Sequence, residues 1–273
     1  MTGCDSARIV NSLRTQRGQA ISEFIVIAPV MLFLAFAVVQ FVLLYQAKAT
    51  LDVATLEAAR AGAVSHGSMT AMEDGLARGL APLYARRADS DGARAALTQA
   101  QANVVRASLI TIVSPTREML EDFARPRFYP AEGIRYNEIP NDTLMYRSPA
   151  VGPHSQVAIQ DANLLKIRVH YCHDMYVPLV NKVLYYAVNV IGNVAADGVF
   201  AREPADARHD AYGAPRRPDL MCRTKLADGI ETGRWPLALE SEAIVRMQSS
   251  YRADAAHEPT ELPGMARSRA ARR

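Results

Sequence analysis

The chain has 273 residues, of which 49% are hydrophobic and 22% are charged, with 31 Lys and Arg against 28 Asp and Glu. A formal net charge of +3 offers no concentrated basic face, so the composition argues against a nucleic-acid partner. The hydrophobic and aromatic content is high enough to bury a core, which excludes wholesale disorder. The apolar residues are unevenly distributed, however, and one block near the N-terminus decides the class of protein.

This apolar block runs from Phe24 to Ala47 without a charged side chain, and Glu23 and Lys48 bound it. A helix over the block rises about 36 Å, against a hydrocarbon thickness of about 30 Å. The sequence therefore predicts one membrane-spanning helix within residues 19–47. A buried core helix is the alternative, but such helices usually carry a polar face.

Positive charge is concentrated on the N-terminal side of the predicted span, at Arg8, Arg14 and Arg17. The other side begins with Lys48 and Asp52, whose charges cancel. Because positively charged flanks stay in the cytoplasm, we expect a cytoplasmic N-terminus and an exported body, with a single crossing of the membrane.

The peptide before the block reads Arg17-Gly18-Gln19-Ala20-Ile21-Ser22-Glu23-Phe24. It resembles a type IV prepilin processing site of the Flp/Tad type. The residues that follow are similar to the TadE-like family, which comprises pseudopilins of tight-adherence pilus systems. The resemblance implies that a prepilin peptidase cuts after Gly18. Gln19 then becomes the N-terminus, Glu23 the fifth residue and Phe24 the sixth.

Gly18 and Glu23 also have physical reasons to stand at these positions. A Gly gives the peptidase a backbone without a side chain. A carboxylate is tolerated where lipid meets water but becomes costly deeper in the bilayer. In a filament, the new ammonium of Gln19 in one subunit can neutralise Glu23 of a neighbour and set the register. The alternative is an ordinary juxtamembrane Gly with a Glu solvated by head groups.

The resemblance further implies a minor pilus subunit or assembly factor in Flp pilus biogenesis or related secretion. Its partners would be the bilayer, the prepilin peptidase, the major pilin, other pseudopilins and the assembly platform of the bacterial inner membrane, with a periplasmic C-terminal domain. We expect no enzyme, no metal and no cofactor, since the common catalytic motifs are absent from the sequence. The alternative is an unprocessed single-pass envelope protein whose exported domain binds another protein.

After the span, the helix is expected to continue from Lys48 to about Tyr84, with a break between Gly62 and Gly67. Small side chains recur along it at three- and four-residue spacing, at Ala47, Leu51, Ala54, Ala58 and Gly62. Backbones can approach closely along such a stripe. It could hold a neighbouring subunit or the protein's own sheet, and the sequence leaves both open.

The rest of the exported part is predicted to be α+β. A second helix is expected at residues 92–106, and three half-polar strands at residues 108–113, 163–171 and 236–248. Such strands suggest a small antiparallel sheet, solvated on one face and covered by helix on the other. Long irregular loops are expected between them, at 115–162, with a short helix at 117–123, and at 198–235. Residues 175–191 show a helical tendency, but their polar side chains argue against a second crossing.

These segments divide the chain into five expected regions. They are a cytoplasmic leader (1–18), the transmembrane helix (19–47), an exported helical region (48–106), an exported α+β domain (107–250) and a disordered basic tail (251–273).

The three Cys residues become an even number once the leader is removed, because Cys4 lies within it. Cys172 and Cys222 remain on the oxidising side, which favours a disulfide over two free thiols. Cys172 also belongs to a run from His170 to Asp174 that could suggest a metal site. Alternation along a strand would separate these side chains, so structural roles are preferred.

Overall fold

The structure is a computed structural model that describes residues 6–131, 133–188 and 231–252, together with residues 222, 225, 226 and 229. This part of the chain has a long N-terminal helix, shorter helices and two small antiparallel sheets. The predicted α+β class is confirmed.

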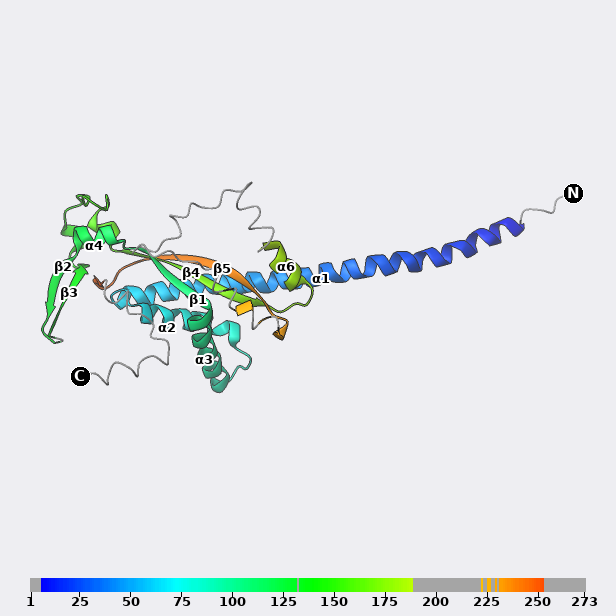
Figure 1. The fold of residues 1–273 in the computed structure, drawn as a ribbon, viewed down its shortest axis with the longest axis horizontal. Coiled ribbons are helices and arrows are strands. Elements are labelled where there is room, and N and C mark those ends of the chain that lie inside the picture. The colour runs from blue at the N-terminus through cyan, green and yellow to red at the C-terminus, as the bar shows by residue number, and fades with distance from the viewer. Residues whose placement is uncertain are drawn as a thin grey trace.

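Helix α1 runs from Ser6 to Val64, 59 residues, and is therefore about 88 Å long. Its N-terminal half projects alone from the body, whereas its C-terminal half lies among the other elements (Figure 1). The helix ends inside the predicted break. Gly67, with φ of +81°, donates its N–H to the carbonyl of Gly62 at 2.9 Å and turns the chain back.

Helix α2, Met69–Leu80, packs on α1 through backbones in close approach. A Cβ atom on Gly75 would lie 2.9 Å from the Cα atom of Ala58, and one on Gly79 would lie 2.6 Å from the Cβ atom of Ala54. Ala54 and Ala58 are themselves fully buried. The stripe of small side chains is therefore occupied by the protein's own elements, which decides between the two alternatives.

Helix α3, Ser90–Ala107, follows α2 through the short 3-10 helix η1, Ala81–Tyr84. Asp89 caps α3, since its carboxylate accepts a hydrogen bond from the N–H of Gly92 at 2.7 Å. This confirms the helix predicted at 92–106, which begins two residues earlier than expected.

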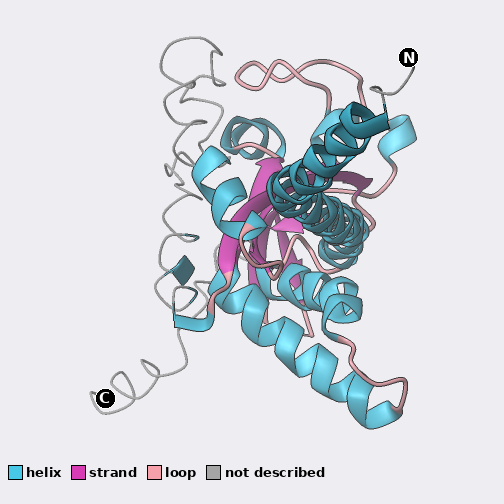
Figure 2. Ribbon diagram, turned by 90° about the vertical axis from the view of Figure 1, so that its right-hand side faces the viewer, coloured by secondary structure: helices cyan, strands magenta, loops and turns pink. Residues whose placement is uncertain are grey.

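The first sheet consists of the three predicted strands, β1 (Ser108–Ser114), β4 (Leu164–Met175) and β5 (Trp235–Arg246). They are antiparallel in the order β1-β4-β5, so the longest pairing joins β4 to β5. Figure 2 looks along α1 and shows these strands beside it. The sheet and the C-terminal half of α1 thus enclose the main core.

The two faces of β4 differ as predicted. Its inward side chains are at most 2% exposed, at Leu165, Ile167, Val169 and Tyr171. On the outer face, Lys166 pairs with Glu242 at 2.8 Å and Arg168 pairs with Glu240 at 3.0 Å. The solvated face is therefore covered by cross-strand ion pairs.

One inward position of β5 is polar. Ser241 is buried, and its hydroxyl donates a hydrogen bond to the carboxylate of Asp52 on α1 at 2.6 Å. The bond satisfies a polar group that burial would otherwise penalise, and it connects the sheet directly to the long helix.

A second sheet was not predicted. It joins β2 (Arg125–Tyr129), β3 (Ile134–Ile139) and β6 (Tyr251–Arg252) in the order β2-β3-β6. The expectation of an irregular segment at 115–162 is therefore wrong for this hairpin, although the short helix α4, Arg117–Phe123, is confirmed. Most of β2 is exposed and it contains Pro126, so it lacks the apolar alternation by which strands are recognised.

Strand β6 also occupies the first two residues of the expected tail. The guanidinium carbon of Arg252 lies 4.4 Å from the ring centre of Tyr129 and 4.1 Å from that of Tyr136. Its Nε donates to the buried carboxylate of Glu138 at 3.3 Å. A cation between two aromatic faces and a carboxylate thus orders this residue, an arrangement that local sequence does not reveal.

Helix α6, Val180–Tyr186, forms within the segment of helical tendency and contacts α1 and β5. The remaining short helices are η2, Leu144–Tyr146, and α5, Ile159–Ala162. The loop predicted at 198–235 and the basic tail after Arg252 lie largely outside the described residues.

The contact between α1 and α2 predicts an unusual response to Gly79→Ala. Replacing a helical Gly by Ala ordinarily stabilises a helix, but here the new methyl group would overlap Ala54. We expect the free energy of unfolding to fall by about 1 to 3 kcal/mol, as measured by thermal or denaturant unfolding in detergent. The control Asp74→Ala lies on the exposed side of α2 and should be neutral or slightly stabilising. A stable Gly79→Ala variant would contradict the close packing.

Candidate functional site

The four residues of the predicted processing and assembly motif all lie on α1. Gly18 and Gln19 fall within its helical backbone, and Glu23 and Phe24 follow with exposed side chains. Gln19 and Glu23 are four residues apart, which puts them on one face of the helix. Phe24 is 69% exposed.

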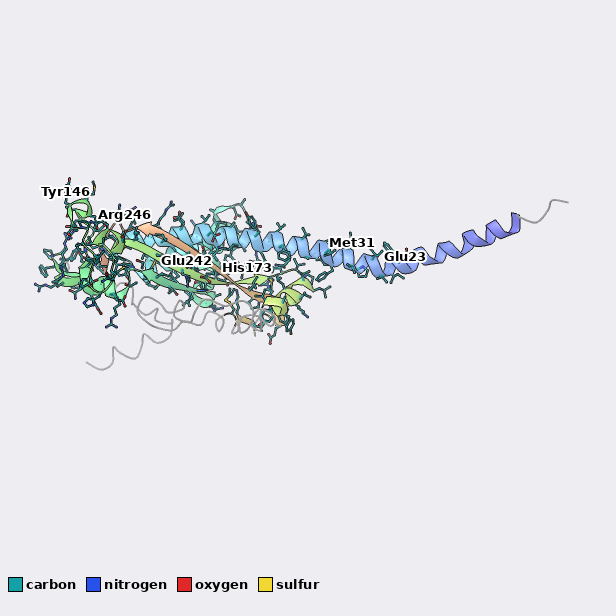
Figure 3. The ribbon with its side chains drawn as sticks, turned by 90° about the horizontal axis from the view of Figure 1, so that it is seen from above. Glu23, Met31, Tyr146, His173, Glu242 and Arg246 are labelled. Atoms are coloured by element: carbon teal, nitrogen blue, oxygen red, sulfur yellow. A yellow bond between two sulfur atoms is a disulfide. The ribbon has the colours of Figure 1, made fainter. Side chains whose placement is uncertain are left out.

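From Glu23 onward, α1 has the length and composition of a membrane span. Its large apolar side chains are more than half exposed, at Ile25, Val26, Ile27, Val30, Met31, Leu32 and Val38. Glu23 and Met31 lie on the part of the helix that leaves the body (Figure 3). A core helix would be covered by the protein, whereas a surface of this kind is stable only in an apolar surrounding. Membrane anchoring through this helix is thereby supported.

From Gln40 onward, the body contacts one side of the helix. Gln40 is 1% exposed, and its Oε1 accepts a hydrogen bond from the backbone N–H of Val177 at 3.0 Å. One turn later, Leu44 packs in a small cluster with Met175 and Trp235. In the last part of the segment expected to span the membrane, residues 19–47, the protein's own chain therefore covers one side of the helix.

A hollow of about 280 Å³ lies beside this junction, between α1, η1 and the end of β4. The hydroxyl groups of Tyr84 and Tyr171 form a hydrogen bond within its lining. His173 and Asp174 also line the hollow, and Asp174 pairs with Lys225 at 3.2 Å.

Burial shifts the pKa values of Tyr84, Tyr171 and His173 so that their uncharged forms are favoured. Burial raises the pKa of Tyr84 to about 12. Burial also raises the pKa of Tyr171, and the neighbouring Tyr84 adds to the effect. Burial lowers the pKa of His173 to about 4, with Asp174 opposing the shift and Lys225 adding to it. The uncharged side chains of Tyr84, Tyr171 and His173 therefore contribute to the packing of this region.

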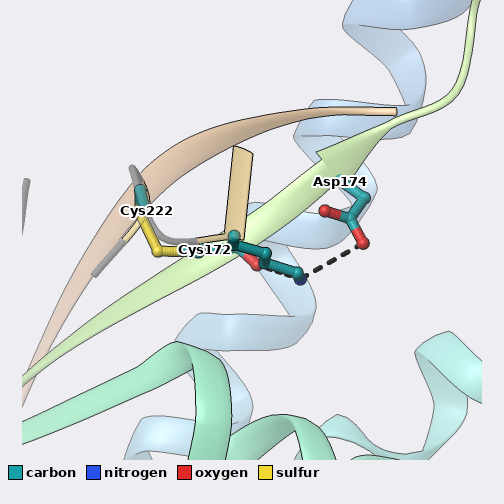
Figure 4. The surroundings of a disulfide bond; sticks show 4 residues. Cys172, Asp174 and Cys222 are labelled. Carbon is teal, nitrogen blue, oxygen red and sulfur yellow. Dashed lines mark hydrogen bonds and ion pairs between the residues drawn. A yellow bond between two sulfur atoms is a disulfide. The ribbon is translucent and has the colours of Figure 1, made fainter. Parts of the chain in front are cut away.

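The residues of the possible metal run are separated in the structure. His170 lies on the solvated face, where it contacts Glu240 at 3.2 Å. Cys172 is bonded to Cys222, with their Cα atoms 5.5 Å apart. Figure 4 shows this disulfide beside the ion pair of Asp174. Within the described residues, no three His, Cys, Asp or Glu side chains are grouped as metal ligands would be.

Residues 18–60 match the model of the family described as TadE-like protein. The resemblance predicted from the sequence is confirmed. The match begins at Gly18 and extends through the exposed part of α1 into its buried part. No curated protein and no solved structure matches the chain.

Sequence reasoning found the TadE-like segment but missed the contacts that position it. The bond from Gln40 to Val177 joins residues far apart in the chain, as does the Tyr84–Tyr171 pair. One signal was available, because Gln40 is a polar residue within an apolar run. A polar side chain in such a run usually contacts protein and not lipid.

The neutral imidazole of His173 predicts a pH-dependent stability. Its folded pKa of about 4 lies below the ordinary 6.5, so between these values the unfolded chain binds a proton that the folded chain does not. The contribution of His173 to stability is therefore fully present above pH 6.5 and is lost as the pH falls toward 4. We expect His173→Phe to remove about 3 kcal/mol of this loss, as measured by denaturant unfolding at several pH values.

The control for this experiment is His154→Phe, because His154 is exposed. An unchanged pH dependence in His173→Phe would show that the imidazole is not held neutral by burial.

The bond between Cys172 and Cys222 predicts a further stability effect. It closes a loop with a sequence separation of 50, and the chain-entropy model assigns such a loop about 4 kcal/mol. The chain should migrate faster on a non-reducing gel than on a reducing one. Cys172→Ser should abolish that difference and lower the unfolding temperature, while Cys4→Ser should do neither. Equal migration of the unmodified chain under both conditions would count against the bond.

Proposed function

We propose that this protein is a TadE-like pseudopilin, acting as a minor subunit or assembly factor in Flp/Tad pilus biogenesis or a related secretion system. The observation that carries the proposal is the TadE-like match at 18–60 on a helix whose apolar side chains are exposed. The body packs on the C-terminal part of the same continuous helix.

Processing after Gly18 is the first step of the proposed role. The cytoplasmic leader would be removed by a prepilin peptidase, and Gln19 would become the N-terminus. Because α1 is helical through Gly18, an enzyme that takes an extended substrate has to unwind this part of the helix. The small size and weak helix propensity of Gly assist that unwinding.

Glu23 supplies the second step, which is registration between subunits. The freed ammonium of Gln19 is one turn from Glu23 of its own chain, and a neighbouring subunit can bring a second ammonium to the same carboxylate. A subunit displaced along the axis leaves the carboxylate unpaired in the bilayer, at a cost of roughly 3 kcal/mol or more at its centre. The proper register is thereby favoured.

The distribution of buried surface supports a role for the exposed half of α1 in assembly. Residues Ala54 and Ala58 are covered by α2, so the small-residue stripe is closed to other subunits. The segment from Phe24 to Val39 is open to them. We therefore assign helix contacts with the major pilin, other pseudopilins and the inner-membrane assembly platform to this segment, with the body in the periplasm.

One observation favours a second role for the exported body. Met145 and Tyr146 are 91% and 89% exposed, and Tyr146 lies at the end of the body farthest from the projecting helix (Figure 3). Large apolar side chains displayed in this way are typical of protein contacts. An unprocessed anchored protein that binds an envelope partner through this end is the alternative function.

Processing can be tested by intact-mass analysis of the membrane form. In cells with an active prepilin peptidase, the protein should begin at Gln19, and Gly18→Leu should retain the leader because the bulky side chain blocks the cleavage position. Gly3→Leu, a change elsewhere in the leader, should still be processed. An unmodified chain that retains the leader would overturn the pseudopilin proposal and support the alternative.

Registration can be tested with Glu23→Gln, which removes the charge and keeps the shape. Insertion and cleavage should be unaffected, while pilus assembly, measured by electron microscopy or shearing, should fall at least about tenfold if the lost pairing exceeds roughly 1.4 kcal/mol. Glu57→Gln is the matched control, because Glu57 is an exposed residue of the same helix outside the span. Normal pili in the Glu23→Gln strain would argue against the pairing.

A further inference from the structure

We infer that the exported body rests on the membrane through a foot, formed by Tyr176, Leu179, Val183 and Tyr186, that inserts into the lipid interface beside α1. These side chains belong to α6 and the turn before it, and they are 52%, 64%, 54% and 54% exposed, respectively. The inference depends on membrane anchoring through α1. It does not depend on cleavage after Gly18 or on a role in pili.

The foot is one face of a helix whose other face is packed. Leu179, Val183 and Tyr186 are spaced by four and three residues, so they lie on one side of α6. On the opposite side, Val180 is 4% exposed and Asn181 is 1% exposed. The apolar exposure is therefore not a consequence of a loosely attached helix.

Directed contacts hold α6 on the body. The side-chain amide of Asn181 donates to the carbonyl of Gly233 at 2.9 Å. The ring of Trp235 lies 5.0 Å from that of Tyr185 and 5.6 Å from that of Tyr186. Trp235 also belongs to the cluster that contains Leu44 of α1. The foot is thus fixed to the same helix that enters the membrane.

The position of the foot is set by the bond between Gln40 and Val177, one residue after Tyr176. Figure 1 shows α6 beside α1 at the point where the long helix leaves the body. Phe41 and Val42 of α1 are 58% and 60% exposed, so an apolar surface continues from the span to the level of the foot. A bilayer that surrounds α1 up to this level meets the foot.

The composition of the foot selects lipid as its occupant. Tyr and Trp with basic neighbours are characteristic of the zone between hydrocarbon and head groups. Lys182 lies over the ring of Trp235 at 5.9 Å, and Arg234 lies over the ring of Tyr176 at 5.4 Å. Such cations can reach phosphate groups while their stems follow apolar surface. Aliphatic side chains at the tip and aromatic and basic groups around them match the gradient of the interface.

Backbone strain at the tip of the foot agrees with this assignment. Leu179 has φ of +69°, a conformation that is unfavourable for a bulky residue. Its side chain is 64% exposed, so packing within the chain offsets little of that cost. Burial of the side chain in lipid would supply a compensating stabilisation.

The foot also determines the depth of Glu23. If the outer edge of the hydrocarbon lies near Gln40, a layer of about 30 Å accommodates about 20 helical residues and ends near Ala20. Glu23 then lies about one turn inside the cytoplasmic edge. An unpaired Glu23 carboxylate costs more free energy at that depth than at the membrane surface, so a compensating positive charge stabilises it more there.

The test uses the full chain in phosphatidylcholine vesicles at a high lipid-to-protein ratio, with and without dibrominated phosphatidylcholine as a quencher. The chain has one Trp, so Trp235→Phe gives a silent background. Three reporters are placed on it: Leu179→Trp in the foot, Val30→Trp in the span and Met145→Trp at the far end. Far-ultraviolet circular dichroism and the non-reducing gel verify that each variant is folded.

We expect brominated lipid to reduce the fluorescence of Val30→Trp and Leu179→Trp at least about twofold, because both side chains contact acyl chains. Met145→Trp should respond to aqueous acrylamide and not to brominated lipid. Native Trp235 of the unmodified chain should show partial quenching by lipid, which gives a reading without any substitution.

Each of the other outcomes overturns a distinct statement. Quenching of Val30→Trp without quenching of Leu179→Trp would contradict insertion of the foot but would still support membrane anchoring. Protection of Leu179→Trp from both quenchers would show that a second chain, and not lipid, covers this surface. Absence of quenching at Val30→Trp would contradict membrane anchoring through α1 itself.

Discussion

The packing of the C-terminal half of α1 against α2 and the inner face of the first sheet is the contact on which the rest of the structure depends. Ala54 and Ala58 allow α2 to approach closely, and the inward side chains of β4 close the core around the same helix. Because α1 continues without interruption from this core into its exposed apolar half, one helix connects the body to the anchor.

Helix α1 serves both as the membrane anchor and as an element of the core. This double role determines which parts of its surface are open to partners. The small-residue stripe could have joined subunits, but the fold places it in the core. Contacts in the membrane are left to the segment before Gln40, and contacts outside it to the body, whose far end displays Met145 and Tyr146. The bond between Gln40 and Val177 marks the border between these two surfaces. A TadE-like segment thus carries a folded α+β body.

The sequence predicted those elements whose local pattern reflects their burial. Strand β4 alternates in sequence because one face lies on the core and the other carries ion pairs, and β1 and β5 pair with it. Strands β2 and β6 gave no such pattern, because β2 is mostly exposed and β6 has only two residues. Their stabilisation comes from Arg252, which is held by Tyr129, Tyr136 and Glu138. These partners are distant in sequence, so no local window contains the arrangement.

The sequence by itself determined the apolar span, its basic flank, the Gly18 to Glu23 spacing and the class of the fold, because each depends on the identity and order of neighbouring residues. The tertiary structure alone decided that the protein's own elements cover the small-residue stripe. It also decided where the body meets the helix and which face of α6 remains exposed. Those features depend on contacts between segments separated by many residues, such as Gln40 with Val177 and Asp52 with Ser241. Folding brings such pairs together. The free energy of these contacts depends on that arrangement, so the local sequence does not reveal it.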